Sequence, residues 1–125
     1  MTTPARRNDA SAPWFDGLSS GVLLIHQCSR CDTYSRPDAV ACPTCLADGL
    51  HWVPAAGSGS VVCVITEHHA QDQTTLGLVE LDEGPWLAVR LIDSADAKPG
   101  ARVELIVLTP PEGEPIPAFT LVPAP

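Results

Sequence analysis

The sequence has little positive charge and few aromatic side chains. Lys and Arg together number 7 against 15 Asp and Glu, so the formal net charge is -8, and Phe, Trp and Tyr make up only 5% of the chain. Such a charge repels phosphate backbones, whereas proteins that bind single-stranded nucleic acid need a basic groove with exposed stacking aromatics. The composition therefore argues against a nucleic-acid partner.

Long apolar runs are also missing. No stretch approaches the roughly 18 apolar residues that a membrane helix needs, and Arg6 and Arg7 near the N-terminus are not followed by the apolar core of an export signal. We therefore expect a cytoplasmic protein with no membrane partner. Disulfides seldom persist in that reducing compartment, so the 5 cysteines point to metal binding before disulfide bonds.

Recognisable catalytic motifs are absent too. The sequence contains no glycine-rich phosphate loop, no dinucleotide fingerprint and no Ser-His-Asp order typical of a hydrolase. Glu67, His68 and His69 are consecutive and could perform acid–base chemistry, which keeps a free-standing enzyme open as a minor alternative. Cys63 lies in the apolar run VVCVI, where we expect a small buried side chain rather than a nucleophile.

The chain does contain a doubled Cys-x-x-Cys motif, formed by Cys28 with Cys31 and by Cys42 with Cys45, with ten residues between the pairs. Tetrahedral zinc takes four thiolates at about 2.3 Å each, and two such knuckles supply them. Because the protein fills all four coordination positions, no position remains for water or substrate, and we expect the metal to be structural.

Two other interpretations of the cysteines stay open. A redox dithiol needs only one Cys-x-x-Cys, so the second copy makes this the weaker alternative. Iron also occupies four-cysteine sites. Iron knuckles of the rubredoxin type, however, usually carry Gly after the second cysteine, where Asp32 and Leu46 stand in this chain. Zinc is therefore the preferred assignment.

The 125 residues fit a single domain-sized unit with three predicted parts. We expect a disordered leader over residues 1–12, a short helix and the cysteine module over 13–54, and a barrel over 55–125. The leader is rich in Ala, Thr, Ser and Pro without periodicity. Short apolar segments between Gly and Pro breakers predict strands, at residues 22–28, 51–53, 60–67, 76–82, 85–92, 102–108 and 116–122. The polar stretch 68–77 is predicted to be an exposed loop.

Strands of this number and length are typical of a small barrel, because closing the sheet removes its exposed edges. The predicted fold class is mostly β. The cysteine module is expected on the N-terminal side of a small five-stranded antiparallel barrel.

Four further side chains are candidates for contact with a partner or an acyl group. Trp14 and Phe15 are two large aromatics at the end of the predicted leader, and they either cover the barrel or anchor a partner protein. His68 and His69 open the predicted polar loop, where side chains either meet a ligand or have no role.

The order of these segments resembles a known family. The stretches PWFDGLSSGVLLIHQCSRCDTYSRPDAVACPTC, LHWVPAAGSGSVVCVITEHH, LGLVELDEGPWLAVRLI and KPGARVELIV follow one another as in small bacterial and archaeal proteins that join a rubredoxin-like zinc ribbon to an OB fold. That family was first catalogued as a domain of unknown function. The resemblance covers about residues 13–123, and it implies an OB-fold barrel and zinc bound by Cys28, Cys31, Cys42 and Cys45.

The resemblance also implies a function. Members of that family occur beside thiolase-like enzymes and bind acyl-CoA thiolases, aldolases or acyltransferases as accessory subunits. We therefore expect a non-catalytic component that binds a thiolase-fold enzyme and supports its reaction on acyl-CoA or ketide substrates, with acyl-CoA at the shared interface. A nucleic-acid-binding OB-fold protein is the alternative from another class, and a free-standing acyl-CoA enzyme is the less favoured one.

Overall fold

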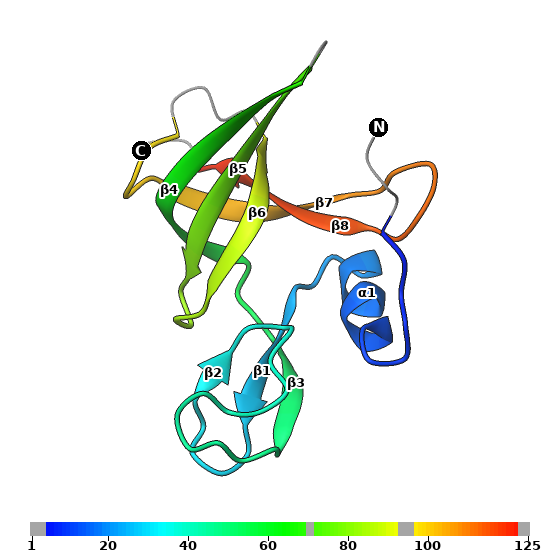
Figure 1. Cartoon of the computed structure of the whole chain (residues 1–125), viewed down its shortest axis with the longest axis vertical. Coiled ribbons are helices and arrows are strands. Elements are labelled where there is room, and N and C mark those ends of the chain that lie inside the picture. The colour runs from blue at the N-terminus through cyan, green and yellow to red at the C-terminus, as the bar shows by residue number, and fades with distance from the viewer. Residues whose placement is uncertain (1–4, 70–71, 93–96, 123–125) are drawn as a thin grey trace.

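The described residues, 5–69, 72–92 and 97–122, form one short helix, a small sheet and a barrel in the computed structural model (Figure 1). The side chains of residues 69, 72 and 73 are not described. This architecture confirms the predicted mostly-β class. In chain order the elements are α1 (Ala12–Ser19), β1 (Leu24–Cys28), β2 (Tyr34–Ser35), β3 (Leu50–Pro54), β4 (Ser58–His69), β5 (Asp72–Leu81), β6 (Trp86–Ile92), β7 (Arg102–Leu108) and β8 (Ile116–Leu121).

The first sheet is a three-stranded ribbon with the order β2-β1-β3, and both outer strands run antiparallel to β1. His26 in the middle of β1 faces Ser35 on one side and Trp52 on the other. In Figure 1 the ribbon lies below the barrel, at the opposite end of the molecule from the tip of the β4–β5 hairpin. The ribbon therefore holds the cysteine knuckles away from that hairpin.

The second sheet closes on itself in the order β4-β5-β6-β8-β7, with β7 pairing back onto β4. All of its pairs are antiparallel except β6 with β8, which run parallel. A closed ring with an odd number of strands cannot alternate in direction throughout, so one neighbouring pair has to be parallel, and five strands closed in this order are typical of an OB fold.

Two glycines make the entry into the barrel possible. Gly57 has a φ of 80°, a left-handed conformation that glycine adopts without strain, and its carbonyl accepts a hydrogen bond from the Leu105 N–H. At Gly59 the strands β4 and β5 approach so closely that a Cβ atom would overlap the carbonyl oxygen of Glu80. These contacts explain the Gly-Ser-Gly-Ser spacing before the first long strand.

One hydrophobic core joins the helix, the ribbon and the barrel. Pro13 stands in the first turn of α1, where its missing N–H costs nothing. The side chains that α1 and the following turn bury pack in the same cluster as those of the barrel, so the modules share a core. The buried members are Phe15, Leu18, Leu23, Ile25, Val61, Val79, Leu81, Val89, Leu91, Val103 and Phe119.

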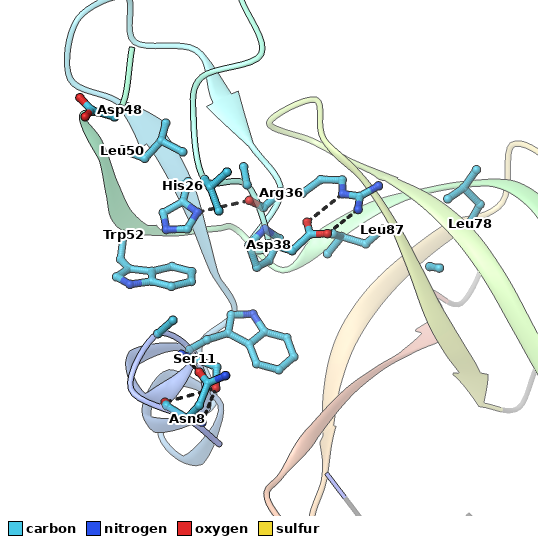
Figure 2. Close-up of a pocket in the computed structure, with 16 residues that line it drawn as sticks. Asn8, Ser11, His26, Arg36, Asp38, Asp48, Leu50, Trp52, Leu78 and Leu87 are labelled. Carbon is cyan, nitrogen blue, oxygen red and sulfur yellow. Dashed lines mark hydrogen bonds and ion pairs between the residues drawn. The ribbon is translucent and has the colours of Figure 1, made fainter. Parts of the chain in front are cut away.

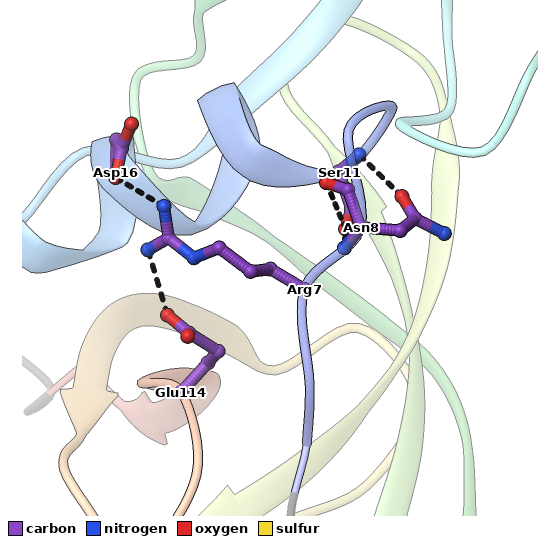
Figure 3. Close-up of polar contacts among 5 residues, drawn as sticks. All are labelled: Arg7, Asn8, Ser11, Asp16 and Glu114. Atoms are coloured by element: carbon purple, nitrogen blue, oxygen red, sulfur yellow. Dashed lines mark hydrogen bonds and ion pairs between the residues drawn. The ribbon is translucent and has the colours of Figure 1, made fainter.

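Residues 5–11, part of the expected disordered leader, make defined contacts in the structure (Figure 3). Arg7 donates hydrogen bonds from its guanidinium to the carboxylates of Asp16 at 2.8 Å and Glu114 at 2.7 Å. The Glu114 N–H also donates to the Ala5 carbonyl at 2.9 Å. Opposite charges therefore tie this segment to α1 and to the β7–β8 connection, while residues 1–4 lie outside the described part of the chain.

Two expectations about the β4–β5 region are wrong. The stretch predicted to be a loop over residues 68–77 is mostly strand, since β4 runs to His69 and β5 begins at Asp72. Cys63, expected to be buried, is exposed. The register shifts between Val61 and Cys63, and beyond this bulge the two strands pair with each other without β7 alongside β4. Cys63 and Ile65 therefore face away from the core, while Val61 and Val64 stay packed in or against it.

Candidate metal centre and the groove beside it

The four cysteines of the doubled motif converge at the end of the ribbon. Their sulfur atoms all lie within 4.8 Å of one another. The Sγ atoms of Cys28 and Cys45 are 3.6 Å apart, and those of Cys31 and Cys42 are 3.5 Å apart. Sulfurs placed tetrahedrally at about 2.3 Å from a zinc ion would be separated by about 3.8 Å, so this set of donors fits zinc.

The two knuckles have matching backbone geometry. The N–H of Asp32 donates to the Cys28 carbonyl and the N–H of Leu46 to the Cys42 carbonyl, both at 2.9 Å. Asp32 has a φ of 63° and Leu46 a φ of 64°. A left-handed conformation costs a residue other than glycine roughly 1–2 kcal/mol. Each knuckle therefore contains one strained residue, and the two turns close around the same point.

Backbone N–H groups also reach the sulfurs. The Arg30 N–H lies 3.4 Å from the Cys28 sulfur, and the N–H groups of Thr44 and Cys45 lie 3.4 and 3.5 Å from the Cys42 sulfur. Asp32 and Leu46, which stand where iron knuckles usually carry glycine, therefore do not keep backbone N–H groups from the sulfurs, and the missing glycines do not by themselves exclude iron.

These hydrogen bonds favour the thiolate forms. The N–H groups of Cys45 and Thr44 lower the pKa of the Cys42 thiol to about 6. The Thr33 side chain, 3.1 Å from the Cys31 sulfur, lowers the pKa of that thiol as well. Against the effect of its hydrogen bond with the Ala47 backbone, burial and the three neighbouring sulfurs raise the pKa of the Cys45 thiol to about 11. Because metal binding requires deprotonated sulfur, Cys45 has to lose a proton when the ribbon takes up the ion.

A groove of about 720 Å³ lies between the ribbon, the start of α1 and the β5–β6 face of the barrel (Figure 2). We call it the ribbon groove. On one side the His26 ring stacks on Trp52, with 3.9 Å between ring centroids and 29° between planes. The His26 Nδ1 is 3.3 Å from the Arg36 carbonyl oxygen, to which it donates in one tautomer. Leu78 and Leu87 supply the barrel side of the groove.

A smaller hollow of about 360 Å³ lies next to the ribbon groove, and Tyr34, Pro43, Pro85 and Trp86 line it. We call it the hairpin hollow. Both depressions are bounded by the segment 36–39, which therefore forms a ridge between them. On this ridge the Arg36 guanidinium donates two hydrogen bonds to the Asp38 carboxylate, at 3.0 and 2.6 Å.

The structure separates the four candidate contact residues. Trp14 is half-buried and lines the ribbon groove, with its ring edge-on to Phe15 at 4.9 Å. Phe15 itself is only 6% exposed and belongs to the core, so its ring is not available to a partner. His68 is exposed on β4, in the hairpin that points away from the ribbon, and the side chain of His69 lies outside the described residues.

Sequence reasoning missed the aromatic side chains around the ridge. Trp52 faces His26 because β1 and β3 pair in antiparallel register across the knuckles. Trp86 is 46% exposed at the start of β6, and its Nε1 donates to the Glu80 carboxylate at 3.1 Å. The contact between Trp52 and His26 could have been predicted from the pairing of the strands that flank the knuckles. The neighbouring position of Tyr34 and Trp86 depends on how the ribbon meets the barrel.

The geometry defines a protein that joins a four-cysteine zinc ribbon to a closed five-stranded barrel. Residues 15–51 match the family described as the ChsH2 rubredoxin-like zinc ribbon domain, and residues 52–108 match the ChsH2 C-terminal OB-fold domain. The chain belongs to the ChsH2 family. The zinc-ribbon family and the four clustered cysteines confirm the predicted zinc cofactor, and these four sulfurs are suited to hold it.

Known proteins extend this comparison. In the solved Ltp2-ChsH2(DUF35) aldolase, one chain is 31% identical to this one, with a TM-score of 0.81 over 95% of this chain and 98% of that chain. A DUF35-family protein of unknown function from Sulfolobus solfataricus is 15% identical, with a TM-score of 0.68 over 92% of this chain and 87% of that one, which supports the fold alone.

A curated relative is much longer than this chain. The probable enoyl-CoA hydratase alpha subunit of Thermomonospora curvata is 34% identical over 100 residues, which cover 76% of this chain and 31% of that protein. The chain thus spans about a third of the length of the curated relative that it matches. Within the described residues, no helix has the length and apolar character needed to cross a membrane.

Proposed function

We propose that the chain is a non-catalytic accessory subunit that binds a thiolase-fold enzyme, an acyltransferase, thiolase or aldolase, and supports its reaction on acyl-CoA or ketide substrates. The observation that carries this proposal is the match, along almost the whole of both chains, to a chain of an aldolase named for Ltp2 and ChsH2. A match that includes both modules and their arrangement suggests that the surfaces used for assembly are similar.

The metal site supports a role without chemistry of its own. Four thiolates complete the coordination of zinc, and two of them, from Cys28 and Cys42, are fully buried. Such a site leaves no position for a water molecule or a substrate oxygen. His68 is exposed in the β4–β5 hairpin, at the opposite end of the molecule from the ribbon, so the acid–base alternative gains no support.

The distribution of charge disfavours the nucleic-acid alternative. Arg7, Arg36 and Arg102 are all hydrogen-bonded to carboxylates, the last by a bidentate pair with Asp82 at 2.9 and 3.0 Å. These guanidinium groups are therefore largely neutralised in a chain of net charge -8. A polyphosphate, whether a nucleic acid or the nucleotide end of CoA, would need most of its cations from the partner enzyme.

A small rigid barrel can help a partner without reacting itself. Placed over the mouth of an active site, it would exclude water and fix the position of a thioester arm, which lowers the entropic part of the barrier. This role needs a stable surface and no catalytic group on the accessory chain.

Co-expression tests the proposal. The chain would be produced with the thiolase-fold enzymes encoded nearest to it and, separately, with Ltp2, and each mixture separated by size-exclusion chromatography. We expect one thiolase-fold enzyme to co-elute with the chain, and no binding to a single-stranded oligonucleotide at micromolar concentration. If no thiolase-fold enzyme co-elutes, or if the oligonucleotide binds in a salt-sensitive way, the proposal is wrong.

A further inference from the structure

Exposed apolar side chains gather around the ridge of residues 36–39. Val40, at the end of the ridge, is 89% exposed and borders the ribbon groove, while Tyr34 and Trp86 are 39% and 46% exposed and border the hairpin hollow. Exposed apolar groups of this size cost solubility, and where they gather they mark interaction sites. Trp and Tyr in particular are enriched among the residues that carry binding energy.

Trp14 adds a further aromatic ring to the same surface. Its indole lines the ribbon groove, while its Nε1 is buried without an acceptor among the described residues and is out of reach of an external group. The ring of Trp14, and not its N–H, is therefore what the groove offers to an occupant.

The charge of the surface points to a protein rather than a phosphate ligand. Arg36 and Asp38 neutralise each other on the ridge, and Asp48 is the other charged residue lining the ribbon groove. A nearly neutral apolar face on a chain of net charge -8 offers nothing to a polyanion. It suits the apolar centre of a protein interface, where charged residues are depleted.

We infer that the partner enzyme docks across this ridge, placing one apolar element in the ribbon groove and another in the hairpin hollow. The inference rests on the proposed function, since it names the surface of that same complex. Trp14 and Trp52 contact the first element, and Tyr34 and Trp86 contact the second. The β4–β5 hairpin, with its exposed His68, lies away from this interface.

Substitutions of exposed residues test the interface without disturbing the fold. Trp86→Ser and Val40→Ser remove apolar side chains from the docking face, and Ile65→Ser and Val122→Ser are matched controls, because these two residues are 59% and 41% exposed elsewhere. Affinity for the thiolase-fold enzyme found by co-expression would be measured by calorimetry. We expect Trp86→Ser to raise Kd about 30-fold and both controls to leave it within about threefold.

The outcomes distinguish the interface from the function. If the wild-type chain binds the enzyme but Trp86→Ser and Val40→Ser bind it as the controls do, the docking face is wrong and the accessory function stands. If the wild-type chain binds no thiolase-fold enzyme, the proposed function is wrong, and the inference about the docking face is wrong with it. If sedimentation shows that the chain alone dimerises and Trp86→Ser abolishes the dimer, the face belongs to a second copy and the inference is overturned.

Discussion

Replacing Cys42 by Ser should unfold the zinc ribbon and leave the barrel closed. Cys42 is fully buried, and among the described residues the other possible metal ligands in its cluster are the three remaining cysteines, so none is left to replace it. Within residues 24–54, Ile25 is the one large aliphatic side chain that is fully buried. Burial of such a side chain contributes about 1.5–3 kcal/mol, whereas a structural zinc contributes about 10–16 kcal/mol.

The barrel has its own means of support. Its five strands hydrogen-bond in a closed ring, and its core includes Val79, Val103 and Phe119, each of which is fully buried. Loss of the metal should therefore remove the ribbon as one cooperative unit and lower the stability of the barrel only through the core residues that they share.

Metal analysis and amide hydrogen exchange would follow the change. We expect about one zinc per wild-type chain and none in Cys42→Ser, together with loss of protection at the Asp32 and Leu46 amides, whose N–H groups are hydrogen-bonded in the knuckles. Amides of β7 and β8 should stay protected. Cys63→Ser, which alters an exposed cysteine outside the site, is the control. A Cys42→Ser chain that retains zinc, or that keeps its knuckle amides protected without it, would refute the reasoning.

Three further predictions concern other parts of the molecule. Gly59→Ala should destabilise the chain by about 3 kcal/mol in urea denaturation, because the new Cβ overlaps the Glu80 carbonyl; an unchanged midpoint would contradict the close strand contact. Arg7→Gln should raise the pKa of Glu114, which Arg7 holds below its usual range. Carbon NMR titration measures this, and the stability that the pair contributes above pH 4.5 should vanish as pH falls through the lowered pKa. The apparent affinity for zinc, measured by competition with a chelator, should fall more steeply with pH below about 6, where the Cys42 thiol of the metal-free ribbon takes up a proton that zinc must displace, and the same slope above and below pH 6 would contradict this.

The sequence predicted the strands whose residues pack into the core. The stretch 102–108 became β7 with the same bounds, and the stretches 85–92 and 116–122 became β6 and β8 within a residue. Alternating apolar residues between Gly and Pro breakers leave few other structures for such short segments. The metal site could be predicted equally well, because each Cys-x-x-Cys pair is brought together by a local turn.

What the sequence could not predict depends on contacts between distant segments. The polar residues after His68 suggested a loop, yet His68 pairs with Gln73, and backbone pairing of this kind is indifferent to polarity. Exposure of Cys63 followed from a bulge and from the end of the β4–β7 pairing, neither of which leaves a mark in the apolar pattern. The ridge between the two hollows exists only because the ribbon folds against the β5–β6 hairpin.

The central claim is that the chain supports a partner's chemistry without performing any. It is tested most directly by measuring kcat/KM of the purified thiolase-fold enzyme on an acyl-CoA substrate, with and without an equimolar amount of the zinc-loaded chain, beside the chain alone. The account predicts no turnover by the chain, weak turnover by the enzyme and a marked increase when both are present. Turnover by the chain alone, or an enzyme rate that the chain leaves unchanged, would contradict it.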